Sequence, residues 1–265
     1  MTQLAKTQNG GALATANQID DMFGGAGSFR LPIDAPLPAI KVLRETPMYE
    51  TPEGDTVKDI VGHIIYWHNC NQYYATEYGD GEQGPPACAS SDGLKPDGGE
   101  NPMAGPCRQC PYNEYGSGDD GRGKKCQNTI RLYVLRDGDI IPSVIKASPA
   151  SLSKKESLMT WLTNAPNVAN RAGMGTKYQP IKASFKLHKK EFDSGFSASV
   201  IDLTTVRVLD PNDQADLDYL GRLAKLYKNF MENYIGRIAD DVAGENVEGT
   251  TADTPVMDDD QDIPI

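Results

Sequence analysis

The sequence predicts a mainly β fold with accessory helices, and two patterns carry this prediction. Apolar residues alternate with polar ones over several short segments, which is the period of a half-buried strand. Near the carboxyl end, apolar residues recur at three- and four-residue spacing, which indicates an amphipathic helix. With 265 residues, 38% of them hydrophobic, the chain can form one elaborated domain or two small ones.

The first predicted strands occupy an aromatic and β-branched stretch at residues 59–78, where residues 69–71 can turn between two strands. Residues 130–135 alternate between two sets of side chains, as in a half-buried strand. The tight turn 136–139 then leads into a further strand at residues 140–146.

A short helix and a closing hairpin follow. Ser153 and Glu156 fit a capping box, so we expect a helix to begin there and to stop at Pro166. Residues 181–187 alternate again, and residues 196–209 return as the hairpin partner. Short strands, an inserted helix and a closing hairpin match an OB-fold-like five-stranded barrel.

A long C-terminal helix is predicted at residues 212–238, after the helix-starting sequence Pro-Asn-Asp. Its apolar face is most simply packed on the sheet. A dimer seam is the alternative interpretation of the same face.

Charge is distributed unevenly along the chain. The formal net charge is −11, yet residues 124–190 contain thirteen Lys and Arg residues and only three acids, a local net charge of +10. No Lys or Arg follows Arg237, whereas nine acids do. The negative total therefore does not exclude a nucleic-acid partner. An acidic block of this kind is typical of a solvated interaction tail, with solubility alone as the alternative.

Export and membrane signals are not apparent. No stretch approaches the roughly 18–20 apolar residues of a membrane span, and residues 1–17 lack the apolar core of a signal peptide. Five cysteines without an export signal favour a reducing cytoplasm, where clustered cysteines more often bind metal than form disulfides.

Four cysteines have the spacing C-x18-C-x2-C-x15-C, at Cys88, Cys107, Cys110 and Cys126. Zn²⁺ favours four thiolates in a tetrahedron, and the surrounding segment has too few apolar residues to order itself by burial. We expect one structural zinc ion per chain. A redox C-x2-C, a disulfide and free thiols are the alternatives, and Cys70 is expected to be a buried core thiol.

Aromatic and basic side chains gather on the predicted strands, as a groove for single-stranded nucleic acid requires. The alternative is that the aromatics are core and the lysines an ordinary solvated face. The candidate DNA contacts are Tyr66, Trp67, Tyr73, Tyr74, Arg131, Tyr133, Lys146, Lys182, Lys186 and Lys190.

The last residues form an acidic run that ends in an apolar tip: Asp258, Asp259, Asp260, Asp262, Ile263, Pro264 and Ile265. This run resembles the C-terminal tip of bacterial single-stranded DNA-binding proteins, although Ile265 stands where that family has Phe. The resemblance implies that the tip docks DNA polymerase, helicase, primase or recombination proteins. With its cysteine loop and long helix, the rest of the chain looks more like a bacteriophage-type single-stranded DNA-binding protein, which would act in the cytoplasm of a bacterial host.

These patterns divide the chain into three parts. We expect a flexible N-terminal arm at 1–36, an OB-like nucleic-acid-binding domain at 37–238 and a disordered acidic tail at 239–265. The central domain contains a zinc-loop insertion at 79–126 and the helix at 212–238.

The expected function is to coat unwound single-stranded DNA without sequence preference during replication, recombination and repair, with no catalytic residues. An accessory enzyme with a zinc ribbon, of nuclease or primase type, is one alternative. An adaptor of replication proteins that does not contact DNA is the other.

Overall fold

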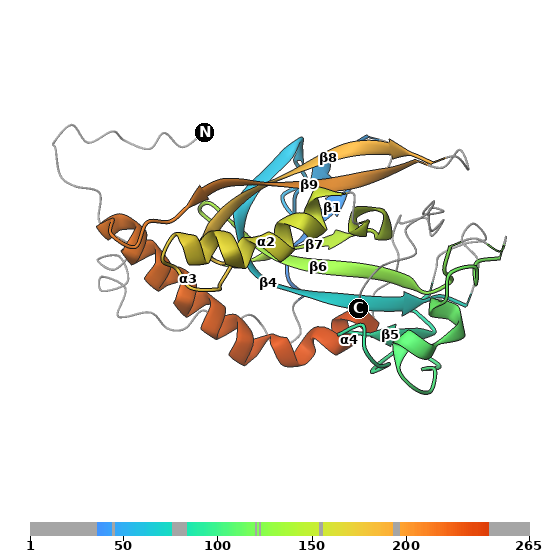
Figure 1. The fold of residues 1–265 in the computed structure, drawn as a ribbon. Helices are drawn as coiled ribbons and strands as arrows, with labels where there is room; N and C mark the ends of the chain where they lie inside the picture. The colour runs from blue at the N-terminus through green and yellow to red at the C-terminus, as the bar shows by residue number, and fades with distance from the viewer. Residues whose placement is uncertain are drawn as a thin grey trace, which may run out of the picture. The chain divides into compact units, whose positions relative to one another are not determined.

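A computed structural model of the chain describes residues 36–43, 46–75, 84–119, 121, 123–153, 156–192 and 197–243. The predicted N-terminal arm, apart from residue 36, and the whole acidic tip at 258–265 lie outside the described residues. Within the described part, the fold is mainly β with accessory helices, as the sequence predicts (Figure 1).

One curled, mixed sheet organises the fold. Its strands follow the order β3-β2-β1-β7-β6-β4-β8-β9, and β5 pairs with β4 outside this path. The bounds are β1 (Ala39–Val42), β2 (Tyr49–Glu50), β3 (Thr56–Val57), β4 (Asp59–Tyr73), β5 (Cys88–Ser90), β6 (Gln127–Arg136), β7 (Ser143–Ala147), β8 (Ile181–Glu191) and β9 (Ser197–Val208). Among the described strand pairs, only β1 and β7 run parallel.

The main core lies on the inner face of this curled sheet. Alternate residues of β4, β6, β7, β8 and β9 bury their side chains there, as period-two patterns require. Helix α2 (Ser157–Arg171) covers this face with Leu158, Trp161 and Leu162. The indole N–H of Trp161 donates to Thr205 Oγ1 at 3.0 Å, so this tryptophan is fixed in the core.

Serine hydroxyls close the free edge of β9. The backbone N–H of Ile201 donates to Ser151 Oγ at 3.0 Å, and that of Leu203 donates to Ser157 Oγ at 2.9 Å. Ser151 lies in the short helix η3 (Pro149–Leu152), and Ser157 is the first residue of α2. These bonds satisfy donors that an open sheet edge would leave unpaired.

The predicted turn at residues 69–71 is wrong. Strand β4 continues through this segment because β6 pairs with it as far as Gln72 and β5 pairs with Asn71 to Tyr73. The strand is irregular elsewhere, since its register with β6 shifts between Ile64 and Tyr66. The segment 69–71 also contains neither Gly nor Pro, which would favour a turn.

Both predicted ends of the first helix are wrong as well. Helix α2 begins at Ser157 with Glu156 as its N-cap residue, and no side-chain cap bond forms. Pro166 lies inside the helix, which continues to Arg171. A proline removes one helical hydrogen bond. Burial of Ala165 and Ala169 against the core holds the helix together on both sides of it.

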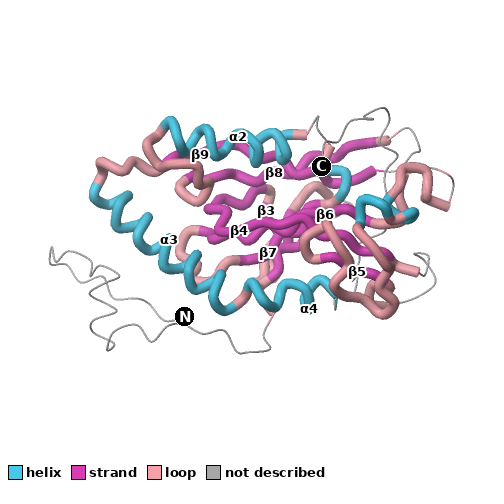
Figure 2. Tube along the Cα trace, turned by 60° about the horizontal axis from the view of Figure 1, so that its bottom comes forward, coloured by secondary structure: helices cyan, strands magenta, loops and turns pink. Residues whose placement is uncertain are grey.

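Helix α3 (Gln214–Asn233) begins with a capped turn, since the Asp213 side chain accepts from the N–H of Asp216. The short helix η4 (Ile235–Arg237) and α4 (Ile238–Ala243) follow it. Figure 2 shows α2 beside β9, whereas α3 and α4 follow one another along the other side of the sheet. The predicted tail boundary at residue 239 therefore falls inside α4, where Val242 is buried.

Leu223 of α3 packs with Ile65, Leu135 and Leu209 in a second, smaller core on the outer face of the sheet. None of the described helices is sufficiently long and apolar to cross a membrane.

Candidate nucleic-acid and metal sites

The predicted DNA-contacting aromatics lie on two different faces of β4. Tyr66 pairs across the sheet with Tyr133 of β6, and both belong to the outer face. Trp67 pairs with Leu132 and packs against the inner core. Since neighbouring residues of a strand point to opposite faces, Tyr66 and Trp67 cannot contribute to one surface.

Helix α3 and the residue after it cover the outer aromatic face. The Phe230 ring centroid lies 5.7 Å from that of Tyr66 and 4.9 Å from that of Tyr133. Tyr234 follows at 5.2 Å from Phe230, and its hydroxyl donates to Asp241 of α4. Burial raises the pKa of both Tyr133 and Tyr234. The outer aromatics thus form a packed layer between sheet and helix.

His68 completes this layer. Its Nδ1 faces the Ser91 carbonyl at 2.6 Å and must therefore carry the proton, which leaves Nε2 to accept from the Tyr133 hydroxyl at 3.0 Å. Burial lowers the pKa of His68. His63 lies elsewhere, donating to the Gln179 carbonyl at 2.9 Å, so the two histidines do not converge on one site.

The expectation that Arg131 and Tyr133 form an exposed basic and aromatic face is therefore wrong. Tyr133 is 0% exposed and Arg131 is 6% exposed. Strand parity correctly separates them from the inner core. Strand parity cannot predict that a helix more than eighty residues after Tyr133 covers the second face.

Three other aromatic residues that were predicted to contact DNA are partly accessible to solvent. Trp67, Tyr73 and Tyr74 are each half-buried, and Asn69 between them is exposed. The Tyr73 ring stacks on Tyr112, with ring centroids 4.3 Å apart and an interplanar angle of 18°. Sequence reasoning missed Tyr112, because nothing in its local pattern pairs it with a strand 39 residues earlier.

Most of the lysines predicted to contact DNA already have polar partners within the protein. Lys182 pairs with Asp137, and the Lys190 ammonium lies 2.7 Å from Glu156 Oε1. Lys146 donates to Gln72 Oε1 at 2.9 Å. Lys186 is exposed and makes no ion pair within the part of the chain that is described.

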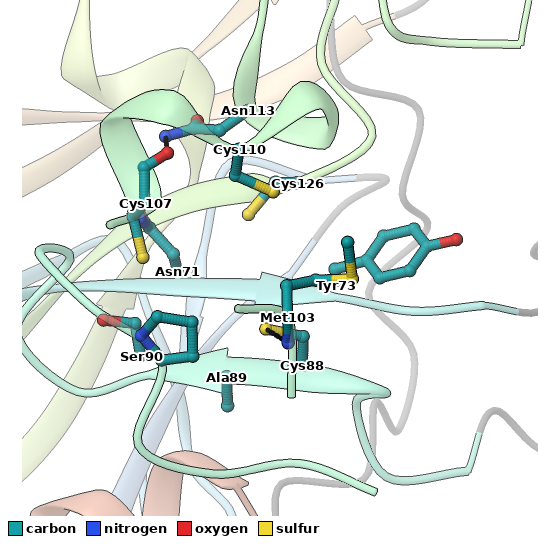
Figure 3. A pocket seen from close by; sticks show the side chains of 11 residues that line it. Asn71, Tyr73, Cys88, Ala89, Ser90, Met103, Cys107, Cys110, Asn113 and Cys126 are labelled. Carbon is teal, nitrogen blue, oxygen red and sulfur yellow. Dashed lines mark hydrogen bonds between the residues drawn. The ribbon is translucent and has the colours of Figure 1, made fainter. Parts of the chain in front are cut away.

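Four cysteines surround one cavity of about 20 Å³. Figure 3 shows Cys107, Cys110 and Cys126 on one side of it and Cys88 beside Met103 on the other. Burial raises the pKa of Cys126 to about 12 and also raises that of Cys88. The remaining cysteine, Cys70, is fully buried outside this cavity, with its sulfur 2.9 Å from Thr129 Oγ1.

No three of these four sulfur atoms lie within 4.8 Å of one another, so they are distributed around the cavity wall. The loop that carries them is nevertheless held by specific hydrogen bonds. Asn113 donates to the Cys107 carbonyl at 2.9 Å, and the N–H of Cys126 donates to the Tyr112 carbonyl at 2.8 Å. The Met103 N–H reaches Cys88 Sγ at 3.4 Å.

A different cluster meets the 4.8 Å criterion among the described residues: Glu156, His188 and Asp202. His188 Nδ1 lies 2.6 Å from Asp202 Oδ2, and Nε2 lies 3.6 Å from Glu156 Oε2. The imidazole thus stands between two carboxylates, and Lys190 occupies the other oxygen of Glu156. The partners of His188 come from two other elements, because Asp202 lies in β9 and Glu156 is the N-cap residue of α2. The local alternation of β8 could not predict either contact.

Comparison of this chain with family models, with curated proteins and with solved structures found no match.

Proposed function

We propose that this protein binds single-stranded DNA without sequence preference through an OB-like barrel. The observation that carries the proposal is the strand order β7-β6-β4-β8-β9, with α2 inserted between β7 and β8. Five strands in a partly open Greek-key barrel are typical of the OB fold, which binds oligonucleotides on one face and through two flanking loops. The cysteine-rich segment between β4 and β6 would be one such loop.

Charge supports this proposal. The segment from β6 to β8 is the basic part of the chain, and the exposed Lys186 and Lys189 project from β8. Cations of this kind bind phosphates with little regard to sequence. Lys182 and Lys190 form ion pairs with Asp137 and Glu156. DNA phosphates would therefore have to displace these carboxylates before they could bind Lys182 and Lys190 in addition to Lys186 and Lys189.

We also propose that the four-cysteine cavity binds one structural zinc ion. Four thiols and no His, Asp or Glu side chain line the cavity, and its volume suits a single ion. Zinc would supply folding energy to a segment with little apolar burial. The residues that would hold the ion are Cys88, Cys107, Cys110 and Cys126.

The acidic tip would recruit replication proteins, as its resemblance to bacterial single-stranded DNA-binding proteins implies. Residues 244–265 contain seven acids and no Lys or Arg, so they could also compete with DNA for the lysines of β8. A deletion that tests this competition should begin at residue 244, because Ile238 to Ala243 form α4.

Fluorescence anisotropy of labelled oligo-dT and of a matching duplex, titrated with full-length protein at two salt concentrations, tests the DNA-binding proposal. Preference for the single strand, with a salt slope of about −0.7 per phosphate neutralised, would support it. No binding by folded protein would reject it and leave the adaptor interpretation. Deletion of residues 244–265 should tighten binding at low salt, and unchanged affinity at both salts would reject the competition.

Metal analysis of purified protein tests the zinc site. We expect one zinc per chain in the wild type and in Cys70→Ala, and loss of zinc in Cys126→Ser. Cys70 is the matched control because it is buried outside the cavity. Iron in place of zinc, absence of any metal, or zinc retained in Cys126→Ser would contradict the proposal.

A second function, metal-dependent cleavage of nucleic acid, is favoured by the cluster of Glu156, His188 and Asp202, the first two of which lie in the basic segment 124–190. One histidine and two carboxylates are ligands that Mn²⁺ or Mg²⁺ can use. Cleavage of labelled single-stranded DNA that requires Mn²⁺ and disappears in His188→Ala would support this function. Intact DNA after prolonged incubation with metal would rule it out.

A further inference from the structure

The cysteine loop brings an aromatic side chain to the end of β4. Tyr112 lies in η2 (Pro111–Asn113), directly after Cys110, and stacks on Tyr73 at 4.3 Å. Its carbonyl accepts hydrogen bonds from the N–H of Cys126 at 2.8 Å and from Ser117 Oγ at 3.0 Å. The loop therefore fixes the position of this ring, and both tyrosines remain half-exposed.

This pair extends a row of alternate residues on the inner face of β4. Trp67 is half-buried at the edge of the main core, Asn69 is exposed, and Tyr73 follows at the strand end. With a rise of about 3.3 Å per residue, Trp67 and Tyr73 stand about 20 Å apart along the strand. The row thus offers two half-exposed aromatic positions. Between them lie Asn69, which is exposed, and Asn71, which is 5% exposed and donates to the Gly93 carbonyl at 3.2 Å.

A polar network holds the floor of this row. The Lys124 ammonium donates to Asn113 Oδ1 and to Asn128 Oδ1, both at 3.2 Å. Asn128 donates in turn to Asn71 Oδ1 at 2.6 Å. The cysteine loop is thereby tied to β6 and β4 through side chains, which keeps Tyr112 in register with Tyr73.

The cysteine loop that carries Tyr112 also carries cations. Lys125 precedes Cys126 and pairs with Asp119 on the same loop. Arg108 is exposed in η1 (Cys107–Gln109). Aromatic faces beside cations are the combination that binds unpaired bases and their phosphates.

Helix α3 covers most of the other aromatic face of β4. Tyr133 is 0% exposed beneath Phe230, so unpaired bases could reach it only if α3 moved away. Among the described residues, Tyr66 is half-buried like Trp67, Tyr73 and Tyr74, but its ring packs against the same Phe230 ring.

We propose that the Tyr73–Tyr112 pair is a base-stacking site for single-stranded nucleic acid, and that the bound nucleic acid runs from this pair toward the exposed Asn69 and Trp67. The inference rests on the proposed function and adds to it a residue of the cysteine loop. The loop is then part of the binding surface as well as a structural insertion.

Oligo-dT anisotropy with full-length Tyr112→Leu, Tyr112→Phe and Tyr115→Leu tests the proposal. Tyr112→Leu should weaken binding about tenfold, whereas Tyr112→Phe, which keeps the ring, should bind within about twofold of the wild type. Tyr115 is an exposed tyrosine of the same loop, and its replacement should leave the affinity unchanged.

Two further measurements separate stacking from misfolding. Thermal unfolding and metal content should be the same in Tyr112→Leu and Tyr112→Phe. Tyr73→Leu should weaken binding as Tyr112→Leu does, because both remove one ring of the pair.

Wild-type affinity in both leucine variants, while the wild type binds oligo-dT, would overturn this inference and leave the proposed function intact. Equal loss in Tyr112→Leu and Tyr115→Leu would also overturn it. Failure of the wild type itself to bind would reject the proposed function.

Discussion

Tyr66 and Trp67 follow one another in β4 and lie on opposite faces of the sheet. The Tyr66 ring is 5.7 Å from Phe230 of α3, whereas Trp67 packs at the edge of the core that α2 covers. This separation decides which aromatics can meet a nucleic acid. Because α3 covers the outer face, the side chains packed there should contribute to the free energy of unfolding.

Phe230→Ala should lower the free energy of unfolding by about 3–5 kcal/mol, because Phe230 is 6% exposed between Tyr66 and Tyr133. Leu217→Ala on the same helix should change it by less than about 0.5 kcal/mol, since Leu217 is 42% exposed. Urea unfolding measures both. Equal effects would mean that α3 is not packed on the outer face as described.

Gly62→Ala should destabilise the protein by about 1–3 kcal/mol. A Cβ at this position would lie 2.5 Å from the Leu135 carbonyl oxygen and 2.9 Å from Val134 Cγ1, so β4 and β6 would have to separate. Gly221→Ala is the matched control, because its Cβ would meet open space on α3 and should stabilise the helix by up to about 1 kcal/mol. Thermal unfolding that ranks the two variants in the opposite order would contradict this prediction.

The contact between α4 and the cysteine loop depends on Gly98. A Cβ there would lie 2.5 Å from Ala243 Cβ, so Gly98→Ala should displace α4 from the loop. Trypsin should then cleave faster after Arg237, which precedes α4. The double variant Gly98→Ala, Ala243→Gly should return the cleavage rate toward that of the wild type. Unchanged cleavage in the single variant would show that α4 tolerates the added methyl group.

Stability should fall as the pH drops below about 6.5. Burial lowers the pKa of His63 and of His68, so the unfolded chain binds protons at these sites more readily than the folded protein does. The two neutral imidazoles contribute fully to the free energy of unfolding above the pKa of histidine in the unfolded chain. This contribution is lost as the pH falls toward the lower pKa values that His63 and His68 have in the folded protein.

Urea midpoints at pH 7.5 and 5.5 measure this loss. The His63→Gln, His68→Gln variant should show a smaller difference between the two midpoints. The pair between Glu53 and Arg136 titrates in a separate range, because the arginine lowers the pKa of Glu53 to about 2. Equal wild-type midpoints at the two pH values would disprove the prediction.

Removal of the Glu156 carboxylate should be costly. Glu156 is 8% exposed and accepts from Lys190 at 2.7 Å, so Glu156→Ala leaves a half-buried ammonium without this partner and should cost about 3 kcal/mol. Glu232→Ala removes one partner of the exposed pair with Lys228 and should cost no more than about 0.5 kcal/mol. Chemical unfolding distinguishes them, and similar losses would show that the Glu156 network adds little.

Local sequence patterns predicted much of the fold. The alternation at residues 130–135 and 181–187 predicted β6 and β8, because a half-buried strand must repeat every two residues. The Arg136 to Asp139 turn also formed, with Gly138 at a positive φ of 88° between β6 and β7. Continuation of β4 through Asn69 was not predictable, because pairing with two distant strands overrides a weak local turn preference.

The sequence by itself determined the strand periodicity, the spacing of four cysteines and the separation of basic and acidic segments, since each is a local property of the chain. Tertiary structure alone decided which face of β4 stays accessible, because α3 and Phe230 are distant in sequence from Tyr66. It also decided that Tyr112 meets Tyr73 and that His188 stands between Glu156 and Asp202. Such meetings depend on how separate elements pack, and no local period encodes them.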